Sequence, residues 1–159
     1  MSLPKFIENL EDMVYERLEA YVYWGTDGKP PDHILFYRDG VSESQYGMVL
    51  EEEIPQITKA CEKYQLSHKC KAWNPKITLL AVGKRHHTRF FPNRENERKN
   101  LAAGLVVDRD VVHPNHTSFY LQSHHSALGT ARTAHYVVIV NQSGYTVDEL
   151  EHIVGAFPD

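Results

Sequence analysis

Residues 33–40 read His-Ile-Leu-Phe-Tyr-Arg-Asp-Gly, an apolar run that ends in a charged turn. Such a run, bounded by turn residues, is typical of a buried strand. Glycine and two prolines lie just before it within residues 25–31, and the prolines stop a helix from continuing into the strand. The stretch therefore predicts a buried strand over 33–37, with the carboxylate of Asp39 just beyond its carboxyl end.

A second apolar run, Lys76-Ile-Thr-Leu-Leu-Ala-Val82, predicts another buried strand. Between the two runs, the sequence predicts a helix that Ser42 or Ser44 caps and that Pro55 kinks or restarts. Two buried strands joined through a helix predict a parallel pair with a right-handed crossover. The inner face of this helix is expected to carry Tyr46, Val49, Leu50, Ile54, Ile57 and Cys61.

The flanking sequence completes an α/β pattern. Apolar residues spaced three and four apart predict an amphipathic helix over 5–24. Thr146 and Glu149 form a capping box that opens a last helix ending near residue 156. One domain over residues 1–159 is predicted, because the sequence holds no repeat and no linker. An exposed loop is expected over 92–104, and strands are expected at 105–107, 118–122 and 135–140.

The composition is that of a globular protein. Of 159 residues, 42% are hydrophobic and 24% are charged, which excludes a disordered chain, a fibrous repeat and a disulfide-stapled miniprotein. No apolar run approaches the roughly 20 residues of a membrane helix, and the first residues do not form a secretory signal. Only two cysteines occur, as a reducing compartment tolerates. We therefore expect a cytoplasmic protein without a membrane partner.

Charge is unevenly distributed along the chain. The net charge is −4, but residues 1–60 hold five basic and twelve acidic side chains, whereas residues 63–99 hold ten basic and two acidic ones. A concentrated basic segment can offer one face to a polyanion, because charges act within a Debye length of about 8–10 Å. A solvated lysine-rich loop is the alternative.

Polar side chains follow each predicted buried strand. Asp39 lies where open α/β sheets bind ligands and suits a hard cation such as Mg²⁺, although strand-end aspartates also cap helices. The cations after the second strand are expected at the same sheet edge, where they would bind phosphate or form a solvated turn. Phe90 and Phe91 could stack on bases, but core packing is expected. The polar segment contains Lys84, Arg85, His86, His87 and Arg89.

Other chemistries receive little support. A late group of histidines could bind zinc, but its spacing repeats neither a helical pair nor a Cys-x₂-Cys knuckle, so surface hydrogen bonding is favoured. The chain lacks G-x-S-x-G and G-x-x-x-x-G-K-[ST], and Ser126 has no strand–elbow context. The histidines are His113, His116, His124, His125 and His135.

Several segments together resemble the Piwi domain of eukaryotic Argonaute proteins, in order and in spacing. The resemblance covers about residues 5–156. It is carried by Ile34-Leu-Phe-Tyr-Arg-Asp-Gly-Val-Ser-Glu-Ser-Gln45, Gly83-Lys-Arg-His-His-Thr-Arg-Phe-Phe91, Val107-Asp108 with His113-Pro114, Phe119-Tyr-Leu-Gln-Ser-His124, Gly129-Thr-Ala-Arg132 and His135-Tyr136.

The resemblance implies an α/β, RNase H-like fold: a mixed sheet with flanking helices. Such a domain acts in RNA silencing, holds a guide small RNA and, in some members, cuts a paired target RNA with two Mg²⁺ ions. Asp39 matches the second catalytic aspartate, a metal ligand. The positions that match guide-backbone and seed-phosphate contacts are Lys84, Arg85, His87, Arg89, His124 and Arg132.

The chain also departs from this pattern. It begins near the first crossover helix and stops before the last catalytic residue, so we expect a partial Piwi domain that lacks the leading strands. Lys5 stands where the catalytic glutamate is expected, and an ammonium cannot bind a cation. Mg²⁺ is therefore expected only in the complete domain, and this chain alone is expected not to cut RNA.

Two further interactions are expected. As an alternative function, the chain would be a protein-interaction fragment, for which the resemblance implies tryptophan-containing silencing partners. Its aromatic-rich surface would then include Tyr15, Tyr21, Tyr23 and Trp24. Without the leading strands, residues 34–37 would form an unpaired edge through which two copies self-associate.

Overall fold

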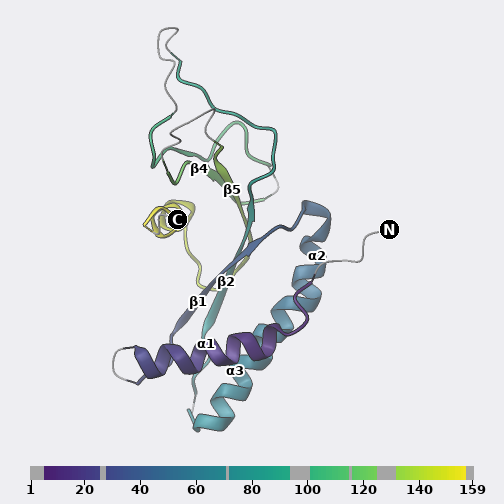
Figure 1. Cartoon of the computed structure of the whole chain (residues 1–159), viewed down its shortest axis with the longest axis vertical. Helices are drawn as coiled ribbons and strands as arrows, with labels where there is room; N and C mark the ends of the chain where they lie inside the picture. Colours follow the sequence, from purple (N-terminus) through teal and green to yellow (C-terminus); the bar gives the residue numbers. More distant parts are fainter. Residues whose placement is uncertain are drawn as a thin grey trace. The chain divides into compact units, whose positions relative to one another are not determined.

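The computed structural model describes residues 6–25, 28–70, 72–93, 101–114, 116–124 and 132–156. These residues form a mixed α/β fold (Figure 1). Its five-stranded sheet has the order β1-β2-β5-β4-β3. The expected fold class is thereby confirmed. The strands are β1 (His33–Asp39), β2 (Lys76–Gly83), β3 (Val106–Val107), β4 (Ser118–Leu121) and β5 (Ala134–Asn141). The longer helices are α1 (Leu10–Trp24), α3 (Ile54–His68) and α4 (Val147–Gly155).

The chain divides into two compact units. The first, here the helical unit, comprises residues 1–36 and 41–78; the second, here the sheet unit, comprises residues 37–40 and 79–159. Both β1 and β2 pass from one unit into the other. The expectation of a single domain over the whole chain stays a prediction.

The helical unit is built on the packing of α1 against α3 (Figure 1). Each helix buries one apolar stripe at spacings of three and four, because 3.6 residues make one turn. The ring of Tyr64 is 2% exposed and lies between Tyr15, at 6.0 Å, and Trp73, at 5.4 Å. The buried stripes are Leu10, Val14 and Leu18 on α1 and Ile57, Ala60, Cys61 and Tyr64 on α3.

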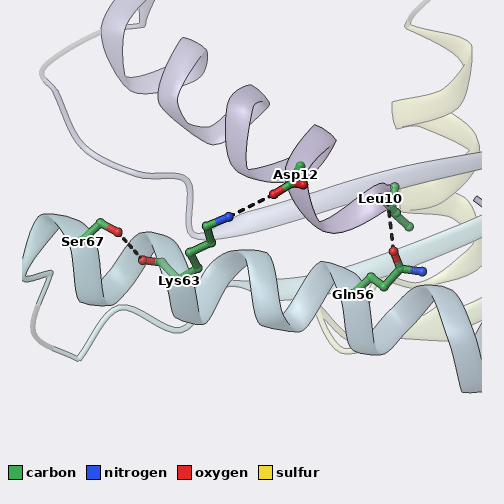
Figure 2. A network of polar contacts seen from close by, with 5 residues as sticks. All are labelled: Leu10, Asp12, Gln56, Lys63 and Ser67. Atoms are coloured by element: carbon green, nitrogen blue, oxygen red, sulfur yellow. Dashed lines mark hydrogen bonds and ion pairs between the residues drawn. The ribbon is translucent and has the colours of Figure 1, made fainter. Parts of the chain in front are cut away.

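Helix α1 begins at Leu10, so the prediction of a helix from residue 5 is wrong for residues 6–9. A side chain distant in sequence holds this end of the helix. Gln56 Oε1 accepts a hydrogen bond from Leu10 N at 3.1 Å (Figure 2), while Gln56 Nε2 donates to Ile7 O at 3.1 Å. Further along, Lys63 Nζ lies 3.0 Å from Asp12 Oδ1. A backbone N–H in the first turn of α1, which has no acceptor within the helix, is therefore bonded to a side chain of α3.

The connection from β1 to β2 is a helical run of several types. It comprises η1 (Glu43–Gln45), α2 (Tyr46–Met48), the π-helical η2 (Val49–Glu53) and α3. Ser42 opens it, with its N–H donating to Gln45 Oε1 at 3.0 Å. Pro55 lies in the first turn of α3, so the expected restart is confirmed. Leu50 was expected to face inward but is 44% exposed, because the buried face of this stretch passes through Val49 and Glu53, which continue the spacing of Ile57 on α3.

Strands β1 and β2 begin side by side, as a parallel pair does, with Lys76 N donating to Asp32 O at 2.9 Å. Residues 77–82 of β2 are all buried, as predicted. β1 differs from its prediction in two ways: it extends to Asp39, and none of its residues is fully buried. β1 lies at the edge of the sheet, so it has a neighbouring strand on one side only, and its residues are less buried than those of β2.

In the sheet unit, β4 is antiparallel to both β3 and β5. Phe119 of β4 lies opposite Tyr136 of β5, and their rings stack at 5.2 Å. α4 packs against β4. Its predicted capping box is confirmed: Thr146 N donates to Glu149 Oε2 at 2.8 Å, and Glu149 N donates to Thr146 Oγ1 at 3.3 Å.

Candidate functional site

The polar segment that follows β2 is attached to the sheet by alternate residues. His86, Thr88 and Phe90 are half-buried, whereas Arg85 and His87 are exposed. His86 Nε2 donates to Thr133 O at 2.7 Å, just before β5. The side chains of Thr88 and Phe90 both contact Tyr120 of β4. The half-buried residues therefore fix the segment, while Arg85 and His87 face solvent.

A stack of rings supports this attachment. Tyr120 and His135 lie opposite each other on β4 and β5, and their rings are parallel within 13° at 4.3 Å. The ring of His86 meets Tyr120 edge-on at 5.1 Å. Burial, and secondarily the neighbouring His86, lowers the pKa of His135. The stack therefore keeps His135 neutral at pH 7, in a packing role.

Arg89 has a different environment from the other cations. It is half-buried, and its Nη1 donates to His86 O at 2.9 Å and to Thr88 O at 2.7 Å. Lys84 and Arg85 are both exposed. Arg89 thus binds the backbone of its own segment with two charge-assisted hydrogen bonds, a contribution that spacing alone did not predict.

Three segments that carry expected RNA contacts meet at one end of the sheet unit. Gly83, the last residue of β2, lies close to His135 O, and Leu121 of β4 pairs with Ala134 of β5. The polar segment therefore leaves the sheet beside the end of β4 and the start of β5. His124 follows β4 and Arg132 precedes β5, and both side chains are exposed. We call the exposed residues Lys84, Arg85, His87, His124 and Arg132 the cationic face.

Asp39 is the last residue of β1 and its carboxylate is exposed. Gly40 follows with a φ of +78°, a left-handed conformation that glycine adopts without strain. Among the described residues, Asp39 belongs to no group of three side chains able to hold a metal ion. The donor set that two Mg²⁺ ions need is therefore absent around Asp39 in this part of the chain.

Another carboxylate group comes together elsewhere in the sheet unit. Ligand oxygens of Asp108, Asp148 and Glu151 all lie within 4.8 Å of one another. Burial raises the pKa of Glu151, and the negative charges of Asp108 and Asp148 raise it further. Sequence reasoning missed this cluster. The spacing of Asp148 and Glu151 on α4 would have paired them, but nothing local brings in Asp108 from forty residues earlier.

The helical unit has an open groove of about 520 Å³ between α1 and α3, here called the aromatic groove. Tyr23 and Trp24 are 77% and 81% exposed, and their rings meet edge-on at 4.7 Å. Of the predicted aromatic surface, these two line the groove, while Tyr15 packs on Tyr64. The described lining consists of Glu16, Glu19, Ala20, Val22, Tyr23, Trp24, Tyr64 and His68.

Other expectations have mixed outcomes. Phe90 packs on Tyr120 as expected, but Phe91 is 70% exposed, because the alternation of the polar segment turns it to solvent. No described histidine belongs to a group of three possible metal ligands. His125, Ser126 and most of the expected loop over 92–104 lie outside the described residues. No helix among the described residues has the length and apolarity to cross a membrane.

Comparison with known proteins agrees with this architecture. The sequence model of the Piwi domain matches residues 2–156. Protein argonaute 4 of Arabidopsis thaliana is 38% identical over 153 residues, which cover 96% of this chain and 16% of that protein. The chain spans 12–16% of the length of the plant and fly Argonaute relatives that it matches.

Solved structures show the same fold. The C-terminal lobe of a budding yeast Argonaute superimposes with a TM-score of 0.86 at 29% identity, over 94% of this chain and 32% of that one. Kluyveromyces polysporus Argonaute with a guide RNA superimposes with a TM-score of 0.85 at 30% identity, over 94% of this chain and 19% of that one. The chain therefore belongs to the Piwi domain family, in the form found in Argonaute proteins.

Proposed function

We propose that this chain is the guide- and target-RNA-binding part of an Argonaute Piwi domain that acts in RNA silencing. The observation that carries the proposal is the cationic face, where exposed cations and histidines from three segments gather at one end of the sheet unit. Guanidinium and ammonium groups suit phosphate oxygens. A similar Argonaute was solved with a guide RNA, which supports a nucleic-acid ligand of this kind.

Fluorescence anisotropy of a short single-stranded RNA, titrated with the chain at several salt concentrations, tests the proposal. The variant Lys84→Ala/Arg85→Ala should bind more weakly and lower the salt slope by about 0.7 for each lost phosphate contact. The matched control is Arg17→Ala/Lys59→Ala, which removes two exposed cations of the helical unit and should leave the slope unchanged. Equal slopes in both variants would overturn the proposal.

We also propose that Asp39 is one metal ligand of a cleavage site completed by residues outside the described part of the chain. Its exposed carboxylate at the end of β1 supports this role. In an Argonaute of full length carrying this sequence, Asp39→Ala should abolish Mg²⁺-dependent target cleavage and spare guide loading. Undiminished cleavage would exclude Asp39 from the site.

A second candidate function rests on the aromatic groove. We propose that it docks tryptophan-containing protein segments, because exposed aromatic rings beside an apolar hollow are favourable seats for an indole. A labelled tryptophan-containing peptide should bind the chain, and Trp24→Ala should weaken it several-fold. The control Leu66→Ala removes an exposed apolar side chain of α3 that does not line the groove. Equal loss in both variants would argue against the groove.

Two remaining proposals concern self-association and location. The position of β1 at the end of the strand order supports pairing of two copies through this strand. Light scattering should show a mass that rises with concentration, and a constant monomer mass would contradict the proposal. Cys61 and Cys70 are free thiols, which supports a cytoplasmic location that microscopy of the tagged protein can test.

A further inference from the structure

The aromatic groove carries negative charge, which has no role in the docking of a neutral indole. Glu16 and Glu19 both line it, and they lie three residues apart on α1, so they share one side of the helix. Both are exposed. The described residues that line the groove include no lysine and no arginine. The rim of the groove is therefore acidic.

Among the described residues, His68 is the basic side chain of the groove lining that contacts one of the two glutamates. His68 Nε2 lies 3.8 Å from Glu19 Oε1, and this contact is an ion pair only while the imidazole is protonated. Lys63 is engaged elsewhere, with Asp12 at 3.0 Å and over the ring of Tyr15. α1 as a whole holds four carboxylates and one arginine. Charge complementarity thus favours a cation in the bound partner.

The aromatic rings add a second attraction for a cation. Trp24 and Tyr23 expose most of their surface beside the two glutamates. Tryptophan is the best aromatic partner for a cation, and a guanidinium can stack on an indole while its N–H groups bind a carboxylate. The groove therefore offers an arginine two simultaneous contacts of different kinds.

We propose that the aromatic groove selects protein segments that carry an arginine or lysine close to the tryptophan, with arginine preferred. This inference rests on the second proposed function, the docking of tryptophan-containing segments. Glu16 and Glu19 determine the preference for charge, and the aromatic rings seat the partner's tryptophan. A segment with an acidic residue in place of the cation is repelled by the same rim.

Fluorescence polarisation with three labelled twelve-residue peptides tests this selection on the whole chain. The first contains tryptophan and a neighbouring arginine, the second has glutamine in place of the arginine, and the third has alanine in place of the tryptophan. We expect the first to bind about five- to tenfold more tightly than the second. Glu16→Gln/Glu19→Gln should remove that difference and leave the affinity for the second peptide unchanged.

The control Glu51→Gln/Glu52→Gln neutralises two exposed carboxylates of η2 that do not line the groove, and it should keep the preference. Equal affinity for the first two peptides would overturn the charge selection while the docking function stands. No measurable binding of either tryptophan peptide would overturn the docking function itself. Binding of the alanine peptide as tight as that of the first would overturn the tryptophan seat.

Discussion

Arg89 gives the sharpest test of the RNA binding that we propose for the polar segment. Its guanidinium donates two hydrogen bonds to backbone carbonyls of its own segment, at 2.9 Å and 2.7 Å. The variant Arg89→Lys keeps the positive charge but loses the planar fork that makes both bonds at once. We therefore expect the loop geometry, and not the total charge, to change.

The expected magnitude follows from these two bonds. Hydrogen bonds to charged groups contribute about 1.5–3 kcal/mol when buried, and half-burial of Arg89 lowers the net loss to about 1–2 kcal/mol. If the loop must be reordered to bind, RNA affinity falls about five- to thirtyfold. The salt slope should stay unchanged, because the number of cations that can meet phosphate is unchanged.

RNA anisotropy at several salt concentrations measures both quantities, and hydrogen exchange of the amides of residues 86–90 reports the loop itself. The control Arg85→Lys alters an exposed side chain in the same way and should change affinity less than twofold. Wild-type affinity in Arg89→Lys would refute the reasoning, as would a changed salt slope with unchanged amide exchange. Either result would indicate that Arg89 does not act by holding the loop in place.

Three further predictions concern the fold. Gln56→Ala removes the hydrogen-bond partner of Leu10 N and Ile7 O, so the free energy of unfolding should fall by about 1–3 kcal/mol. The Tm should fall by about 2–4 °C for each kcal/mol, and an unchanged melting curve would contradict this. Burial raises the pKa of Cys61 to about 11, so at pH 8 iodoacetamide should modify Cys70 first, with mass spectrometry showing Cys61 modified only after unfolding. Equal rates in the folded protein would disprove that ranking. The pKa of His135 is lower in the folded protein than in the unfolded chain, so the unfolded chain binds a proton at higher pH. The free energy of unfolding should therefore be greatest above about pH 6.5 and should fall as the pH drops through the lower pKa of the folded state. Urea unfolding measured between pH 4.5 and 8 should show a smaller fall of the free energy of unfolding at acid pH in His135→Phe than in the wild type. An identical fall in both proteins would count against this prediction.

Local patterns in the sequence determined several elements correctly. The continuous apolar run of β2, the capping box of α4 and the restart of α3 at Pro55 all depend on residues within one or two turns of each other. The spacing of apolar residues, capping hydrogen bonds and the missing N–H of proline all act between residues that are close in sequence. The order of strands and helices along the chain follows from the same local information, whereas the resemblance to the Piwi domain rests on the sequence motifs themselves.

The tertiary structure decided everything that depends on partners far away in the chain. The start of α1 is set by Gln56, and the attachment of the polar segment is set by the contact of His86 with Thr133. The acidic cluster and the aromatic groove likewise join residues forty or more positions apart. No local pattern encodes these pairings, because a side chain's exposure and hydrogen-bond partners are fixed only when distant segments pack together.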